Sequence, residues 1–183
     1  SKAAVVARGT ETGGDVVFVG RGSIDLTGLT EDPRDFVAFG GINPRDSVFG
    51  FGPRIGLGTP IRLYLTGAVP PPYGPGSFKR PTVNSGDVFG VSFGFGGTVS
   101  VPREYVSGSA LRATMTFAGE TFASLGLRPG SYLTTFSNGE TFEINIVPVP
   151  AALPLLSSGL GLLGFMAWRR RNAGSSELHA NQF

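Results

Sequence analysis

The chain has 183 residues, enough for one domain with an appendage, and only 15% of them are charged. It contains no Cys, which excludes a disulfide framework, a thiolate catalyst and a Cys-ligated metal site. The formal net charge is +2, but residues 1–147 hold 12 basic and 12 acidic side chains, so this body lacks the electrostatic footprint of a nucleic-acid-binding protein.

The sequence begins at Ser1, and no charged region followed by an apolar region precedes the body. We expect that a signal peptide has been removed, because the C-terminal segment described below indicates export. The alternative is that the sequence is a piece of a longer chain.

Short β-strands with turn signals between them are predicted along the body. Residues 3–8 and 16–26 flank the Gly-rich stretch GTETGGD, which is typical of a hairpin. Further strands are predicted over residues 60–69, 87–95 and 111–117, where apolar and polar residues alternate. In the second of these, we expect one buried face formed by Phe89, Val91, Phe93 and Phe95.

The last two predicted strands, residues 131–136 and 141–147, form the clearest hairpin. The stretch SNGE joins them, and its Asn138-Gly139 pair suits positive φ in a tight turn. Phe142, Ile144 and Ile146 are expected to face one way.

Loops and a single short helical turn are predicted between the strands. Residues 27–60 and 69–81 are rich in Gly and Pro, and residues 121–130 suggest one helical turn. The fold class is therefore predicted to be all-β, with residues 1–147 forming an antiparallel β-sandwich or jelly-roll-like body.

A charge-free run of 22 residues, from Val147 to Trp168, follows the body. It is long enough to cross a bilayer as a helix, at about 1.5 Å per residue. Trp168 suits the membrane interface, and Arg169, Arg170 and Arg171 are expected to act as a cytoplasmic stop. We predict a sorting segment with one transmembrane helix over residues 148–171 and a polar tail over residues 172–183.

The order of these parts resembles a PEP-CTERM sorting signal, and it is closest to the variant that opens with Val-Pro-Leu-Pro-Ala. The sorting motif would be Val147, Pro148, Val149, Pro150 and Ala151. Val149 stands where the family's usual signal has Glu, and 12 residues follow Arg171. The resemblance implies an exosortase-type membrane protease as a partner, an inner-membrane-anchored precursor, and release to the cell surface or extracellular matrix. Exopolysaccharide is a further candidate partner.

The body is loosely similar to PEP-CTERM proteins without an assigned activity. The similar stretches are GGDVVFVGRGSIDLTGL, GDVFGV, VPREYVSGSAL and ETFASLGLRPGSY. This similarity implies an exported β-protein and no mechanism.

No catalytic, cofactor-binding or metal site is predicted. The single His, His179, lies in the polar tail, so a hydrolytic triad lacks its usual base. Asp87, Glu104 and Glu120 are candidate acids for a glycosidase, although they are isolated in sequence. Glu31, the DPRD stretch at 32–35 and Asp46 lack the regular spacing of a calcium loop. Four tyrosines are candidates for a sugar-binding platform: Tyr64, Tyr73, Tyr105 and Tyr132.

The sequence thus predicts a non-enzymatic, exported cell-envelope or extracellular-matrix protein with no cofactor and no nucleic-acid partner. Two alternatives stay open besides an enzyme: a carbohydrate-binding module of the exopolysaccharide matrix, and a surface subunit that self-assembles by strand addition.

Overall fold

The computed structural model describes residues 4–38, 40–52 and 58–148. Contacts within the chain divide it between Pro148 and Val149. The predicted transmembrane helix, Arg169 to Arg171 and the polar tail lie outside the described residues. Among those that are described, no helix has the length and apolar character needed to cross a membrane.

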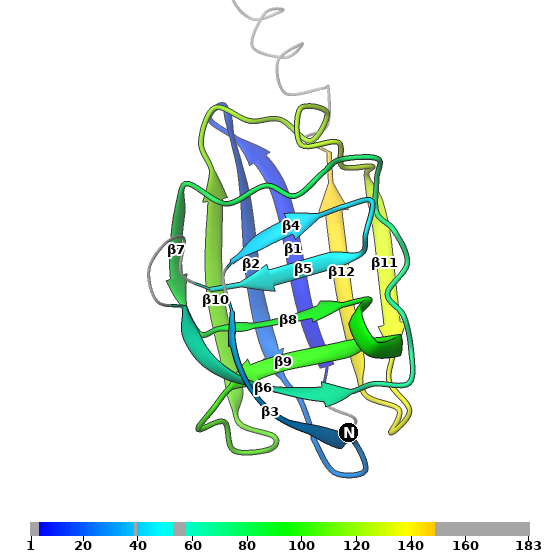
Figure 1. The fold of residues 1–183 in the computed structure, drawn as a ribbon. Helices are drawn as coiled ribbons and strands as arrows, with labels where there is room; N and C mark the ends of the chain where they lie inside the picture. The colour runs from blue at the N-terminus through cyan, green and yellow to red at the C-terminus, as the bar shows by residue number, and fades with distance from the viewer. Residues whose placement is uncertain (1–3, 39, 53–57, 149–183) are drawn as a thin grey trace, which may run out of the picture. The chain divides into compact units, whose positions relative to one another are not determined.

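The described residues form two six-stranded sheets, as predicted for an all-β sandwich-like fold (Figure 1). In order, sheet A contains β11 (Gly130–Thr135), β12 (Thr141–Val147), β1 (Ala4–Thr12), β2 (Asp15–Ser23), β10 (Ala110–Phe117) and β7 (Val83–Gly86). Sheet B contains β3 (Thr30–Ala38), β6 (Thr59–Leu65), β9 (Thr98–Pro102), β8 (Phe89–Ser92), β5 (Val48–Phe51) and β4 (Gly41–Asn43). The strands of sheet B run across those of sheet A in Figure 1.

The predicted alternation places one face of each strand in the core. Leu111, Ala113, Met115 and Phe117 of β10 are all buried, while the residues between them are exposed or half-buried. The buried set of β12, which is Phe142, Ile144 and Ile146, follows the same rule.

Aromatic rings from both sheets fill the centre of the sandwich. The ring of Phe49 lies 5.2 Å from that of Phe18, and the ring of Phe51 lies 4.9 Å from that of Phe89. Gly20 of β2 makes room for this cluster, because a Cβ there would lie 2.3 Å from the Phe51 ring. Gly20 and these Phe rings thus pack together in one core.

The prediction of purely antiparallel sheets is wrong at one place, where β1 and β12 pair in parallel, with Val5 opposite Phe142 and Thr10 opposite Val147. The remaining strand pairs are antiparallel. A hairpin can join only antiparallel neighbours, whereas the first and last strands of this chain are free to meet in either direction.

Residues 27–60, predicted as loops, contain β3, β4, β5 and the first two residues of β6. Two further local predictions also need correction. Phe93 is 51% exposed, because β8 ends at Ser92 and the chain turns there into the 3-10 helix η1 (Gly94–Gly96). The side chain of Phe95 is outside the described set. In the last hairpin only Gly139 has positive φ, at 85°, and the Gly139 N–H donates to the Phe136 carbonyl over 2.8 Å.

Candidate functional site

The three carboxylates considered for catalysis do not meet at one site. Asp87 and Glu104 line a depression of about 260 Å³ beside the beginning of β10. Glu120 lies beyond the other end of β10, where hydrogen bonds from Ser124 and Lys79 lower the pKa of its carboxyl group. The Asp87 carboxylate accepts the Arg112 N–H over 2.7 Å, so it already supports the backbone.

The acidic residues considered for calcium bind protein groups instead. The Arg34 side chain donates to Asp32 and lowers the pKa of this carboxyl to about 2. Asp46 accepts a hydrogen bond from Asn43 over 2.8 Å, and Glu31 lies 3.1 Å from the Arg62 guanidinium. No cluster of three or more metal-ligating side chains occurs in the described part of the chain.

The four tyrosines do not form an exposed platform. Tyr73 is fully buried, and its hydroxyl donates to the Val48 carbonyl. The hydroxyl of Tyr105 accepts the Ile24 N–H over 2.9 Å and donates to the Ser109 carbonyl over 2.7 Å. Tyr64 and Tyr132 are partly buried against the core. These side chains hold loops and strands together, which removes the sugar platform predicted from them.

The predicted sorting motif begins where the sandwich ends. Val147 is half-buried as the last residue of β12, and it lies opposite Thr10 of β1. Pro148 follows and is exposed. Val149, Pro150 and Ala151 are outside the described residues.

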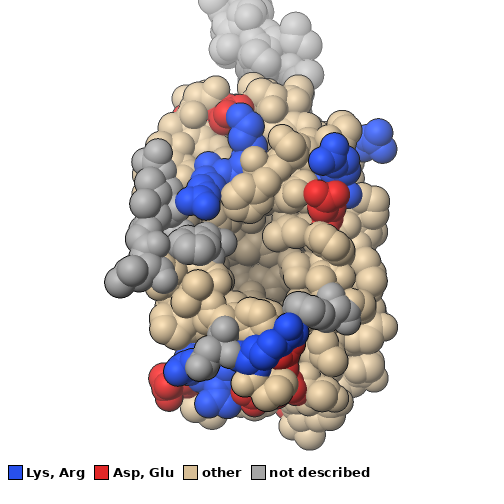
Figure 2. All heavy atoms as spheres, viewed as in Figure 1, with Lys and Arg blue, Asp and Glu red and all other residues tan. Residues whose placement is uncertain are grey.

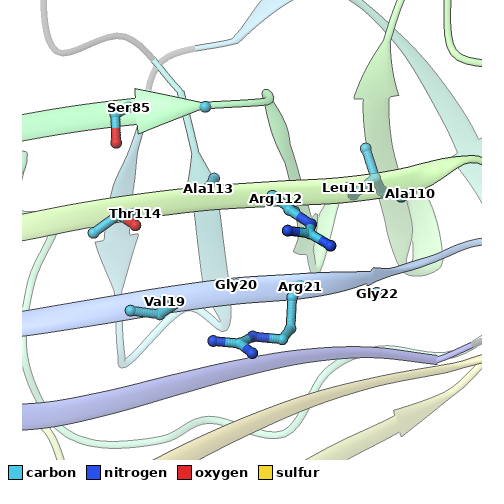
Figure 3. Close-up of a pocket in the computed structure, with 11 residues that line it drawn as sticks. Val19, Gly20, Arg21, Gly22, Ser85, Ala110, Leu111, Arg112, Ala113 and Thr114 are labelled. Atoms are coloured by element: carbon cyan, nitrogen blue, oxygen red, sulfur yellow. The ribbon is translucent and has the colours of Figure 1, made fainter.

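A pocket of about 610 Å³ lies on the outer face of sheet A (Figure 3). It is lined by residues 19–22 of β2, 85–86 of β7 and 110–114 of β10, and we call it the arginine pocket. Arg21 lies directly opposite Arg112 in the β2–β10 ladder, so both side chains are on the same face of the sheet. Thr114 lies between Val19 and Ser85 in the next row.

The turn after β7 holds Arg112 in place. The Asp87 N–H donates to the Arg112 carbonyl over 2.8 Å, and the Asp87 carboxylate accepts the Arg112 N–H. This turn requires Gly86, whose φ is 89° and at which a Cβ would lie 2.2 Å from the Arg112 oxygen. Asp87 therefore binds the backbone of Arg112 and forms no salt bridge with its guanidinium among the described residues.

The arginines in and beside the pocket form no ion pair within the described part of the chain, although Glu143 of β12 lies one row from Arg8 on the same sheet face. The four ion pairs of the described residues involve Arg34, Arg45, Arg62 and Lys79, and none includes Arg8, Arg21 or Arg112. Arg8 of β1 lies opposite Val19, which makes it a diagonal neighbour of Arg21. Three arginines of adjacent strands thus share one sheet face.

Sequence analysis missed this pocket. The alternation in GRGS and LRATMTF places Arg21 and Arg112 on the solvent side of their strands, and this was the available signal. The pairing of β2 with β10 brings the two arginines together. The sequence does not show this pairing, because the strands β3 to β9 come between β2 and β10 along the chain.

The outer face of sheet B has a smaller hollow, of about 160 Å³. Gly50 and Gly90 lie opposite each other in its lining, and Ser92 and Ser100 also line it. Figure 2 shows charged side chains towards the margins of this face and an uncharged hollow at its centre.

Comparison with known proteins gives no match: no protein-family model, no curated protein and no solved structure is significantly similar to the chain.

Proposed function

We propose that the chain is a non-enzymatic protein exported to the cell envelope or extracellular matrix. In this proposal residues 148–171 form a sorting segment with a transmembrane helix, and Arg169 to Arg171 stay on the cytoplasmic side. An exosortase-type membrane protease cuts near Val147 to Ala151. The jelly-roll-like sandwich is then the working part.

The observation that carries this proposal is the position of the sandwich's last strand. β12 lies between β11 and β1, and it ends at Val147, the first residue of the predicted motif. Cleavage after this residue would leave every described strand in the released body. A removable segment requires this arrangement, because losing part of β12 would expose the buried face of sheet A.

The intact mass of the native protein in membrane, surface and medium fractions tests the proposal. We expect a species that ends between Val147 and Ala151 in the surface or medium fraction, and the full-length chain in the inner membrane. A full-length chain found only in the membrane would show a permanent anchor and refute processing.

A second candidate function, a carbohydrate-binding module, is favoured by the arginine pocket, which lies on an open sheet face beside hydroxyl-bearing side chains. The self-assembling subunit is less well supported at three of the four sheet edges, while the fourth, β11, is a regular strand of 6 residues. β4 and β7 are short edge strands of 3 and 4 residues, and β3 carries Pro33 and an irregular register between Asp32 and Phe36. Such features hinder strand addition.

A further inference from the structure

We propose that the arginine pocket binds an acidic polysaccharide, a sugar chain that carries carboxylate or sulfate groups. The inference rests on the second candidate function, carbohydrate binding, and it is independent of how the C-terminal segment is processed.

The charges point to an anionic ligand. Arg21 and Arg112 are exposed, lie directly opposite each other, and have no acidic partner in the described part of the chain. Like charges in directly opposed positions of a sheet are unfavourable. An anion between or across the two guanidinium groups would relieve this repulsion, and each planar guanidinium can bind a carboxylate or sulfate in bidentate fashion.

The geometry suits binding without rearrangement of the backbone. Two hydrogen bonds between Asp87 and the backbone of Arg112, one donated and one accepted by Asp87, fix the main chain there, and β2 is hydrogen-bonded on both sides. Figure 3 shows the two arginines on neighbouring strands, with Ser85 and Thr114 farther along the same pocket. The ordering that binding requires is therefore limited to side chains.

The remaining lining favours a sugar chain over other polyanions. Ser85 and Thr114 offer hydroxyls that can exchange hydrogen bonds with sugar hydroxyls, and Val19 offers a small apolar surface. No aromatic residue lines the pocket within the described residues, so neither bases nor sugar rings can stack there, and recognition depends on charge and hydroxyl groups. The body is neutral overall, with 12 basic and 12 acidic residues in 1–147, so a polyanion would be attracted by a local cluster of cations and not by net charge.

Arg8 extends the positive surface to β1, beyond the pocket itself. The cations therefore lie on three adjacent strands, β1, β2 and β10, with Arg21 and Arg112 in one row and Arg8 in the next row. A linear polymer with a charged group on successive units can contact more than one of them at a time, which a single small anion cannot do.

Binding to oligogalacturonate, measured with the full-length protein in a mild non-ionic detergent, tests the inference. Neutral dextran oligomers of similar length serve as the uncharged comparison. We expect oligogalacturonate to bind and dextran not to bind, and the double variant R21Q/R112Q to weaken binding at least about tenfold. The variant R21K/R112K keeps both charges but loses bidentate geometry. Its affinity for oligogalacturonate should therefore lie between those of the unchanged protein and R21Q/R112Q.

R128Q is the control for the single variants R21Q and R112Q, because each of the three removes one exposed charge, and Arg128 lies in the turn before β11, outside the pocket lining. R128Q should bind oligogalacturonate as the unchanged protein does. The inference is overturned if R128Q weakens binding as much as R21Q or R112Q does, since attraction would then be diffuse. It is also overturned if single-stranded DNA binds equally well through the same two arginines.

Two further outcomes separate this inference from the functions proposed above. Binding of dextran that survives R21Q/R112Q would keep carbohydrate binding and refute the arginine pocket as its site. No binding to either sugar would refute both, while the sorting proposal would still be decided by the mass measurement alone. Unfolding curves of each variant show whether a loss of binding reflects a loss of folding.

Discussion

At the scale of single residues, the Arg21–Arg112 pair is the feature that is hardest to explain as a contribution to the stability of the fold. Other arginines have an acidic partner, as Arg62 does in Glu31, whose carboxylate lies 3.1 Å from the guanidinium. Here two cations face each other on adjacent strands, and the carboxylate of Asp87 accepts the backbone N–H of Arg112. A residue arrangement that opposes stability is a common sign of a functional site.

Replacing Arg112 by Gln is expected to stabilise the unliganded protein, because it removes the repulsion from Arg21. The gain in unfolding free energy should be about 0.2–1 kcal/mol, the usual range for a directly opposed pair on a sheet. Urea unfolding at low ionic strength measures it, and added salt should reduce the difference.

The matched control for this prediction is Arg62→Gln on sheet B, where the arginine has Glu31 as its partner. That substitution should leave stability unchanged or lower it slightly. A stability loss on Arg112→Gln as large as that on Arg62→Gln would contradict the repulsion.

The sequence predicts the side of the sheet on which these residues lie but not their neighbours. Alternation along β10 correctly separates Arg112 from buried Leu111 and Ala113. It carries no information on which strand will lie beside β10. The sugar platform predicted from the tyrosines is wrong for a related reason. Aromatic side chains suit both a binding face and a core, and only the fold decides between these two positions.

At the scale of elements, hairpins are predicted best, because local turn chemistry specifies them. The pair β1–β2 turns through Gly13 and Gly14, with φ of 64° and 88°, and β11–β12 turns through Gly139. Elements that depend on distant pairing are predicted less well. The strands β3, β4 and β5 lie in a stretch predicted as loops, and no strand is predicted over β7 or β9.

The edge strand β3 owes its local shape to Asp32. Its carboxylate accepts the Arg34 N–H over 3.1 Å and the Arg34 Nε–H over 2.9 Å, within the stretch where the register with β6 shifts. Asp32 is only 9% exposed, although it lies at the edge of the sheet. This irregular segment interrupts the row of backbone groups that an edge strand would otherwise present.

Acid is expected to weaken the protein in part through this residue. The pKa of Asp32 falls from 3.8 to about 2 on folding, chiefly through the hydrogen bond from Arg34. A lowered pKa favours the folded state above about pH 4, and this contribution is lost as the pH falls through the range 4 to 2. Asp32→Asn should therefore be less stable than the unchanged protein at neutral pH and should lose less stability across this range.

Urea midpoints measured at about pH 6, 4 and 2.5 for both proteins test this prediction. Asp46→Asn is a suitable control, because the same change is made at a half-buried acid of the β4–β5 turn. Parallel pH profiles for Asp32→Asn and the unchanged protein would show that Asp32 does not contribute to acid sensitivity.

At the scale of the whole molecule, the parallel pairing of β1 with β12 joins the first and last strands of the chain within sheet A. The first and last strands lie side by side in the middle of the sheet, so neither half of the sequence contains a complete layer. The all-β class follows from composition and alternation, but this pairing does not, because no local signal links residues so far apart in sequence.

A chain that ends at Pro148 is expected to fold like the full-length protein, whereas one that ends at Glu140 is expected not to fold. The shorter chain lacks Phe142, Ile144 and Ile146, all buried, and each such side chain contributes about 1.5–3 kcal/mol on burial. Their sum is comparable to the 5–15 kcal/mol of stability that a domain typically has.

Circular dichroism and urea unfolding of the two truncated chains measure the difference. The chain that ends at Pro148 should show one cooperative transition with the midpoint of the full-length protein. A cooperative transition in the chain that ends at Glu140 would mean that β12 is dispensable to the sandwich, and it would remove the structural argument for cleavage just after Val147.

The place of β12 between two neighbours also determines how the sandwich would carry a mechanical load. If the chain is held at Pro148 while its outer face holds a polymer, tension acts along β12, across the hydrogen bonds to β11 and β1. The bonds of both ladders are then sheared together and share the force, whereas a strand peeled from a sheet edge loses them one pair at a time. The strand that joins the body to its tail is thereby supported on both sides against being pulled out.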